Sequence, residues 1–230
     1  MNFNSHSGFP AQFIFFAVFI AIAIIGAIYS AIAAGKRREG LFELAQRLNL
    51  NFDAGKDEGI PERFDFLKQF DEGRDRYAAN VISGNYQQNE ILAFDYHYTT
   101  GSGKNRQDHN LSFFILVVRG SQFPQLTIRR EGFFDRVAET FGFQDIKFES
   151  AEFSKAFCVR SPDKKFAYDV CNAKMIEYLL INRDLSVEIE IEVIALIFGS
   201  RIAVEQFEKD LQRLIEIRSR LPDYLFTQSA

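Results

Sequence analysis

Two aspartates and two histidines near the middle of the chain are, by residue type, the best suited to chemistry. Asp95 and His97 belong to one segment of strand-forming residues, and Asp108 and His109 precede the next such segment. Residues that face each other on antiparallel strands approach within about 5.5 Å. Carboxylates and imidazoles at that distance can bind a divalent metal, which is one hypothesis for this region. The alternative, which we favour, is that these side chains face water beside a loop and bind nothing.

Three glutamates alternate with apolar residues later in the chain. Glu188, Glu190 and Glu192 lie within Ser186–Val193 and predict a strand with one solvated face. Carboxylates about 7 Å apart along a strand suit a cation or a basic partner. A solvent-exposed sheet face explains the pattern without any ligand, and we favour that interpretation. The opposite, buried face is predicted to carry Val187, Ile189, Ile191 and Val193.

Other motifs for chemistry are weak or missing. Gly101-Ser102-Gly103-Lys104 has the composition of a phosphate-binding loop but not its spacing, because Tyr98 and Asn105 stand where Gly and Ser or Thr are required. The sequence has no G-x-S-x-G, and neither Cys158 nor Cys171 has a histidine near it in sequence. We therefore predict no catalytic residue, no cofactor and no resident metal, and an enzyme is the least favoured class.

The elements that would position these residues are a run of strands. Aromatic and β-branched residues dominate three segments, which predicts an antiparallel meander with a polar, mobile loop at Thr100–Asn110. The ranges of the three strands are Tyr77–Ser83, Ile91–Thr99 and Leu111–Arg119. Further extended segments are expected at Leu126–Ile128, Ile146–Phe148, Ala156–Val159 and Ile194–Phe198.

Helices are expected around these strands. The segment from Asn51 to Asp75 is rich in charged residues and glycine and predicts irregular surface chain, with a short helical turn near Phe64–Phe70. Apolar residues at helical spacing predict three helices, at Gly132–Phe141, Asp163–Leu180 and Ile202–Leu221. Helices beside antiparallel strands make the fold class α+β, and we expect residues 36–230 to form one domain.

Residues 1–35 are predicted to hold an N-terminal tail and one transmembrane helix. The segment Ala11–Ala34 has no charged residue, and its 24 residues would extend about 36 Å as a helix. An amphipathic helix is expected to continue or restart from it to about Leu50. The small residues around Ala31 also suit a signal-peptide cleavage site, but the apolar run is longer than such peptides need and no Lys or Arg precedes it. An uncleaved signal anchor is favoured.

Charge predicts the orientation and the partners. Lys36, Arg37 and Arg38 directly follow the apolar segment, so we expect the N-terminus outside and the domain in the cytoplasm. Two cysteines without a C-x-x-C pair suit that reducing compartment. The formal net charge is −4, which argues against nucleic-acid binding. Small residues recur every four positions in the apolar segment and suit helix pairing in a membrane, at Ala23, Ala27, Ala31 and Gly35. The alternative, which we favour, is that alanine is simply common in membrane helices.

One segment resembles a known group. Leu126–Leu180 is similar to a stretch found in a loosely defined group of bacterial single-pass membrane-anchored proteins of unknown function. The similar residues are Asp145-Ile146, Phe148-Glu149-Ser150, Glu152-Phe153, Val159, Asp163, Phe166-Ala167 and Met175, with Arg37-Arg38 and Phe94-Asp95-Tyr96 outside the segment. The resemblance implies a location in the bacterial inner membrane and a fold, but no activity and no catalytic residue.

The function class with the most support from sequence is a tethered protein-interaction or scaffolding domain. A sensor of a small ligand, a lipid or a metal is the alternative, and it would most plausibly use the Thr100–Asn110 loop, because binding residues often lie on loops held by rigid strands. The membrane, through Ala11–Ala34, and a protein partner or second copy, through the transmembrane helix, are the predicted partners.

Overall fold

The structure of the chain is a computed structural model that describes residues 11–130 and 145–226, with side chains from residue 15 onward. The chain divides into two compact units, Met1–Gly40 and Leu41–Ala230, and each is described by itself. The predicted helix at Gly132–Phe141 lies outside the described residues.

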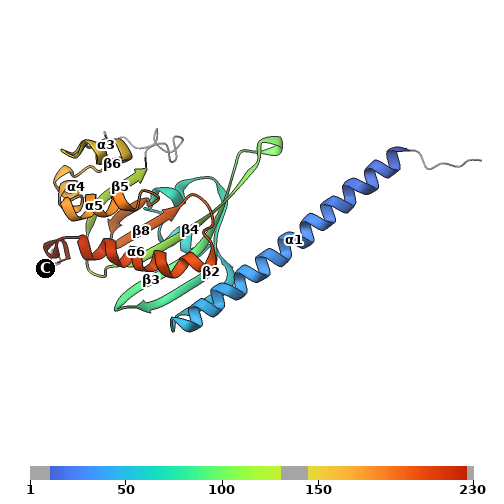
Figure 1. Cartoon of the computed structure of the whole chain (residues 1–230), viewed down its shortest axis with the longest axis horizontal. Coiled ribbons are helices and arrows are strands. Elements are labelled where there is room, and N and C mark those ends of the chain that lie inside the picture. Colours follow the sequence, from blue (N-terminus) through green and yellow to red (C-terminus); the bar gives the residue numbers. More distant parts are fainter. Residues whose placement is uncertain (1–10, 131–144, 227–230) are drawn as a thin grey trace, which may run out of the picture. The chain divides into compact units, whose positions relative to one another are not determined.

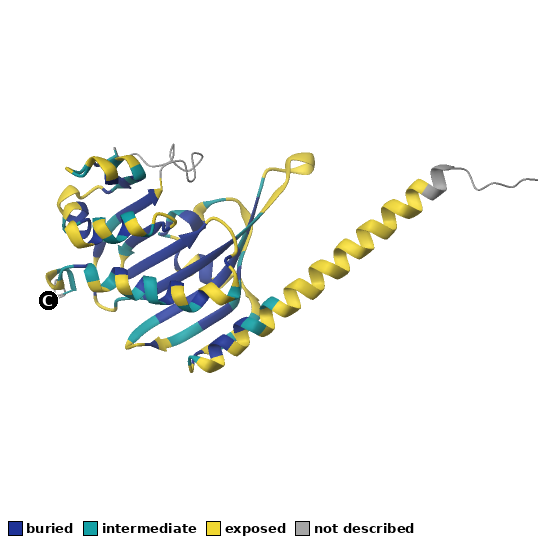
Figure 2. Ribbon diagram, viewed as in Figure 1, coloured by how far each residue is buried: buried dark blue, intermediate teal, exposed yellow. Residues whose placement is uncertain are grey.

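The described part of the first unit, residues 11–40, is helical. α1 spans Ala11–Arg47 without a break, so the predicted apolar helix continues rather than restarts. From Phe15 onward it is long and apolar enough to cross a membrane by length and composition. Its large apolar side chains are exposed, among them Phe15 and Phe19, and Figure 2 shows this exposure along the helix. The last turns of α1, from Leu41, belong to the second unit.

The second unit contains a sheet of eight strands in the described part of the chain, and every pairing is antiparallel. Its spatial order is β1-β2-β3-β4-β8-β7-β5-β6, so the last hairpin lies between strands that come earlier in the chain. The strands are β1 Asn51–Asp57, β2 Arg74–Tyr86, β3 Asn89–Thr100, β4 Gln107–Val117, β5 Phe123–Arg130, β6 Phe157–Arg160, β7 Val187–Ile191 and β8 Val193–Phe198. With its helices, this sheet confirms the predicted α+β class.

The described helices of the second unit are short, except for the last. Figure 1 shows α5 and α6 crossing in front of the sheet. The α-helices are α2 Gly59–Arg63, α3 Ala151–Ala156, α4 Lys164–Val170, α5 Ala173–Ile181 and α6 Phe207–Arg220. Single 3-10 turns are η1 Lys68–Asp71, η2 Gly103–Asn105, η4 Val204–Gln206 and η5 Asp223–Phe226.

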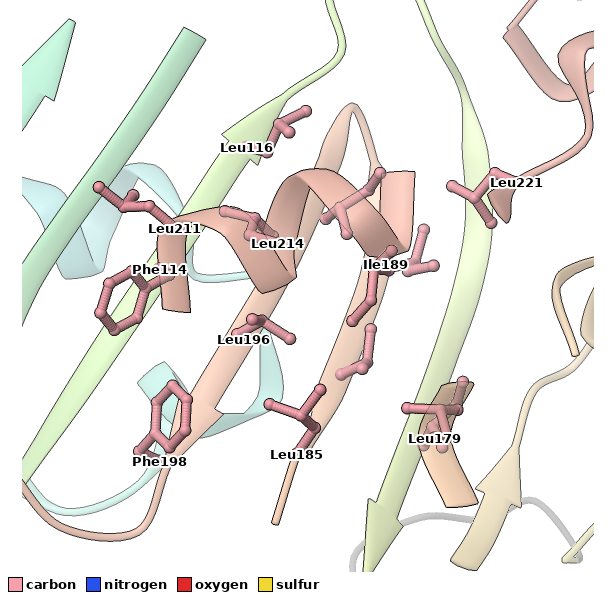
Figure 3. Packing of buried hydrophobic residues seen from close by; sticks show 14 of the residues in the cluster. Phe114, Leu116, Leu179, Leu185, Ile189, Leu196, Phe198, Leu211, Leu214 and Leu221 are labelled. Atoms are coloured by element: carbon pink, nitrogen blue, oxygen red, sulfur yellow. The ribbon is translucent and has the colours of Figure 1, made fainter. Parts of the chain in front are cut away.

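Apolar side chains cover both faces of the sheet. On the face covered by α4, α5 and α6, which we call the helical face, Leu211 and Leu214 of α6 pack with Phe114 and Leu196 of the strands, as Figure 3 shows. On the second face, Phe64 and Phe70 from the segment of α2 and η1 pack against strand residues. A strand that is buried on both faces has a continuously apolar sequence. In β8 every residue from Val193 to Phe198 is apolar and buried.

Two local predictions were wrong. Asn51–Asp75 is not irregular throughout, because Asn51–Asp57 forms the edge strand β1. The predicted helix Asp163–Leu180 is two helices, α4 and α5, because Cys171 ends the first and Asn172 caps the second by accepting hydrogen bonds from two backbone N–H groups. A carboxyl oxygen of Asp163 caps α4 in the same way.

Smaller differences concern boundaries. The polar loop predicted at Thr100–Asn110 is shorter, because β3 extends to Thr100 and β4 begins at Gln107. Ile146–Phe148 is not a strand, although the Ile146 N–H donates to the carbonyl of Val159. The short helix α3 was not predicted.

Candidate functional site

The register of β3 and β4 separates the two histidines that the less favoured metal hypothesis would bring together. His97 pairs with Asn110, whereas His109 pairs with Tyr98. Successive residues of a strand point to opposite faces, so the two imidazoles lie on opposite faces of the sheet. The structure has no group of three or more His, Cys, Asp or Glu side chains that could hold a metal ion among the described residues. The four residues therefore do not come together as one cluster, and the favoured interpretation that they face water is wrong for Asp95, which is buried.

Asp95 is instead part of a buried hydrogen-bond network on the helical face. Its side chain is only 1% exposed, and it accepts hydrogen bonds from Asn80 Nδ2 at 2.9 Å and Ser112 Oγ at 3.4 Å. Arg201 Nε lies 3.6 Å from its Oδ2. Ser112 Oγ also accepts from the backbone of Ile202. The carboxylate thus links β2, β3 and β4 to the chain after β8, which is a structural role.

His97 and Asp108 share the Asp95 face but lie farther along the hairpin. The His97 ring stacks on Tyr77 with centroids 4.7 Å apart, and its Nε2 is 3.9 Å from Asp108 Oδ1. A hydrogen bond from Thr99, and then those from Arg106, hold the pKa of the Asp108 carboxyl below its ordinary value. These contacts order the base of the hairpin loop.

His109 makes the corresponding contacts on the second face. Its ring stacks on Tyr98 at 4.5 Å, and its Nε2 lies 2.8 Å from Thr100 Oγ1. The glycine-rich loop beyond it forms the single turn η2. A side chain at Gly101, whose φ is +67°, would place its Cβ 2.1 Å from the carbonyl oxygen of Asn105. The glycine is thus explained by the tight hairpin turn.

The three glutamates do not line one solvated face, so that prediction was wrong. Glu188 is 2% exposed and forms an ion pair with Arg129 of the neighbouring strand β5. Glu190 is half-buried and accepts a hydrogen bond from Gln125, and its burial raises the pKa of its carboxyl. Glu192 lies in the turn between β7 and β8.

The same turn changes the predicted buried face. Ile191 adopts a positive φ of 55°, which ends β7, and Glu190 pairs directly with Val193 of β8. The chain therefore reverses direction within Ser186–Val193, the segment in which glutamates alternate with apolar residues. Val187 and Ile189 pack on the helical face, while Val193 packs on the second face.

Neither cysteine is arranged as a nucleophile. Cys171 is buried and Cys158 is half-buried, and both are free thiols. Burial raises the pKa of both thiols, which keeps them in the unreactive neutral form.

A groove on the outer side of α5 is lined partly by apolar side chains. Its volume is about 800 Å³, and it lies between the chain leading into α3 and the helices α4 and α5. Phe148 packs edge-on against Tyr168 with ring centroids 5.2 Å apart. Ile176 and Leu180 of α5 complete the apolar floor, and Ile181 at the end of α5 is 77% exposed.

Carboxylates surround this groove, which we call the α5 groove. Glu149, Glu152 and Glu177 are all exposed and all line it. A second hollow of about 430 Å³ shares Glu177 and Ile181 with it and continues along α5 toward α6.

Sequence reasoning did not find the α5 groove. It identified Met175 and Leu179 as core positions of the helix, and both are buried. The missed signal is that Ile176, Leu180 and Ile181 are apolar beside those core positions, so α5 has more apolar surface than the core covers.

Comparisons with known proteins identify a fold and no family. No family model matches the chain, and no curated protein matches it. The crystal structure of the mycobacterial trehalose monomycolate transport factor A, TtfA, is similar in fold. The TM-score is 0.58 at 13% sequence identity, and the match covers 82% of this chain and 96% of that one. Because the identity is so low, the similarity establishes the α+β architecture alone, and the sequence resemblance to bacterial membrane-anchored proteins stays a prediction.

Proposed function

We propose that the chain is a single-pass membrane protein whose α+β domain binds another protein and catalyses no reaction itself. The helix from Phe15, which is long and apolar enough to span, supports the anchor. The basic residues Lys36, Arg37 and Arg38 support an orientation with the domain in the cytoplasm, because positive charge is retained on that side. The bacterial inner membrane is the proposed location.

The α5 groove is the observation that carries this proposal. Exposed apolar side chains that gather around a concave surface are typical of protein-interaction sites, because isolated soluble domains rarely leave such surface in water. Ile181 and Tyr168 are 77% and 50% exposed there. By contrast, the polar residues that were candidates for chemistry from their sequence pattern make hydrogen bonds, ion pairs and ring contacts within the domain. Asp95 and Glu188, for example, are enclosed.

The structural comparison supports an accessory role in a membrane assembly. The protein of similar fold is described as a transport factor. We therefore propose that this chain is a non-enzymatic component of a transport assembly, held at the membrane by α1.

In-cell crosslinking of the full-length protein, followed by mass spectrometry, tests this function. We expect crosslinks to one specific membrane or cytoplasmic protein. A thermal-shift screen of the full chain in nanodiscs against nucleotides and divalent metals should show no stabilisation, since a ligand at a hundred times its dissociation constant stabilises by about 2.7 kcal/mol. A reproducible shift with a nucleotide or a metal, and no protein partner, would contradict the proposal in favour of a sensor.

A further inference from the structure

The helix α5 has apolar residues on two sides, and the core of the domain fully buries only one of them. Met175 and Leu179 face the sheet and are fully buried. Ile176 and Leu180 follow Met175 and Leu179 in sequence; they pack against the edge of the core but are only half-buried and also line the α5 groove, and Ile181 lies at the exposed end of the helix. A helix that packed on the core alone would carry one apolar stripe and polar residues elsewhere. The second stripe therefore indicates a surface that another molecule covers.

Negative charge surrounds this second stripe. Glu152 is already paired with Arg183. Among the described residues, none forms an ion pair with Glu149 or Glu177, and no side chain donates a hydrogen bond to either carboxylate. Lys174, the one basic residue of α5, lines the adjoining hollow together with Arg220 of α6. An apolar floor with two uncompensated carboxylates at its rim favours an occupant that is apolar on one side and positively charged at its edge, because complementary charge steers and orients association.

We propose that the α5 groove binds a short amphipathic helix of the partner protein, with apolar residues at i, i+3 or i+4 and i+7 and with Lys or Arg beside them. This inference rests on the proposed interaction function and specifies the chemistry of its partner. Helix-in-groove recognition uses this spacing, since such residues lie on one face of a helix. The groove is small compared with a stable protein–protein interface, so the affinity of this contact is low. Anchoring both proteins in the same membrane raises their local concentration and favours binding.

Two other occupants fit the charges less well. Anionic lipid headgroups would face the carboxylates of Glu149 and Glu177 and be repelled. The chain's own residues 131–144 contain three acidic residues and one arginine, so this sequence has the same sign of charge as the groove rim. Both are outcomes that the experiment below can detect.

Site-specific photocrosslinking in cells tests the proposal on the full-length chain. Benzoylphenylalanine replaces Ile181 in the groove and, in a separate variant, Lys104 at the exposed tip of the β3–β4 hairpin. We expect the Ile181 probe to capture a protein, with the crosslinked site mapping to a segment that has apolar residues at helical spacing and flanking Lys or Arg. The double substitution Glu149→Lys/Glu177→Lys should lower the yield at least tenfold.

A matched control and a second measurement keep the result interpretable. Glu205→Lys changes the charge of an exposed glutamate in η4, outside the groove, and should leave the yield unchanged. Near-UV circular dichroism should show that each variant is folded. A synthetic peptide of the mapped segment should bind the full chain in nanodiscs, and its affinity should fall as salt rises from about 50 to about 300 mM, because screening weakens exposed charge pairs.

Several outcomes would overturn this inference. They are crosslinks from Ile181 to lipid or to residues 131–144, a mapped segment without basic residues, and a yield that the double substitution leaves unchanged. If the Lys104 probe captures a partner and the Ile181 probe does not, the groove inference fails while the interaction function stands. If no position captures a protein, the proposed function itself fails.

Discussion

Glu188 of β7 and Arg129 of β5 form an ion pair that is almost completely buried between neighbouring strands. Replacing Glu188 by a neutral residue removes a carboxylate that balances the charge of Arg129 inside the sheet. We expect Glu188→Gln to lower the free energy of unfolding by about 3–5 kcal/mol. Urea unfolding of the full chain in detergent, followed by tyrosine fluorescence because the chain has no tryptophan, measures the effect.

The control for this prediction is Glu192→Gln in the following turn, which should change stability by less than about 0.5 kcal/mol. The double substitution Glu188→Leu/Arg129→Met should recover most of the loss, since well-packed apolar residues often replace a buried ion pair without cost. If Glu188→Gln costs less than about 1 kcal/mol, the ion pair does not stabilise the pairing of β5 and β7.

Ile191 is a strained residue whose replacement should stabilise the domain. Its φ of 55° lies in the left-handed region, which a β-branched side chain rarely adopts. Asparagine tolerates this conformation, so Ile191→Asn should raise the free energy of unfolding by about 0.5–1 kcal/mol. The same change at the buried strand residue Ile189 should instead destabilise by more than about 2 kcal/mol. A loss of stability at Ile191 would mean that its apolar contacts outweigh the backbone strain.

Cys171 at the floor of the α5 groove should resist alkylation in the native protein. Burial raises the pKa of its thiol, and for an acid a raised pKa keeps the neutral form dominant to higher pH. Iodoacetamide at about pH 9 should therefore leave Cys171 unlabelled until urea is added. A cysteine placed at the exposed position of Ile181 should react readily in the same experiment, as mass spectrometry can measure. Equal reaction rates would show that the groove floor opens in solution.

The orientation of α1 in the membrane follows from the basic residues after the apolar segment. A fluorescent protein fused to Ala230 should fluoresce, and alkaline phosphatase fused at the same position should be inactive, because positive charge is retained in the cytoplasm. Replacing Lys36, Arg37 and Arg38 by Gln, with three Lys added before Ala11, should weaken or invert this result. An active phosphatase fusion to the unaltered chain would contradict the proposed orientation.

Small residues on one strip of α1 predict that two copies associate in the membrane. Ala27→Leu adds bulk on this strip, so it should lower crosslinking between full-length copies in native membranes. Ile25→Leu changes a neighbouring apolar residue off the strip and serves as the matched control. Gly26 lies on a neighbouring strip of small residues with Ser30 and Ala34. If crosslinking is the same for Ala27→Leu, Gly26→Leu and the control, small residues play no part in the association.

Sequence alone determined the features that depend on local patterns. The uncharged run from Ala11 predicted an apolar helix because length and composition suffice for that inference. The aromatic and β-branched segments predicted β2, β3 and β4, and the apolar spacing of Phe207, Leu211, Leu214 and Ile217 predicted α6, since each pattern repeats with the period of its own element. These elements were enough to place the chain in the α+β class.

Only the tertiary structure decided which residues lie next to one another. Glu188 alternates with apolar neighbours like a solvent-facing residue, but Arg129, 59 positions earlier, compensates its charge inside the sheet. His97 and His109 look adjacent across a hairpin, yet the register places them on opposite faces. The α5 groove depends on how Phe148 and Tyr168 pack beside α5. Register and packing between distant segments are set by the whole core, because a shift of one residue turns every side chain of a strand to the other face.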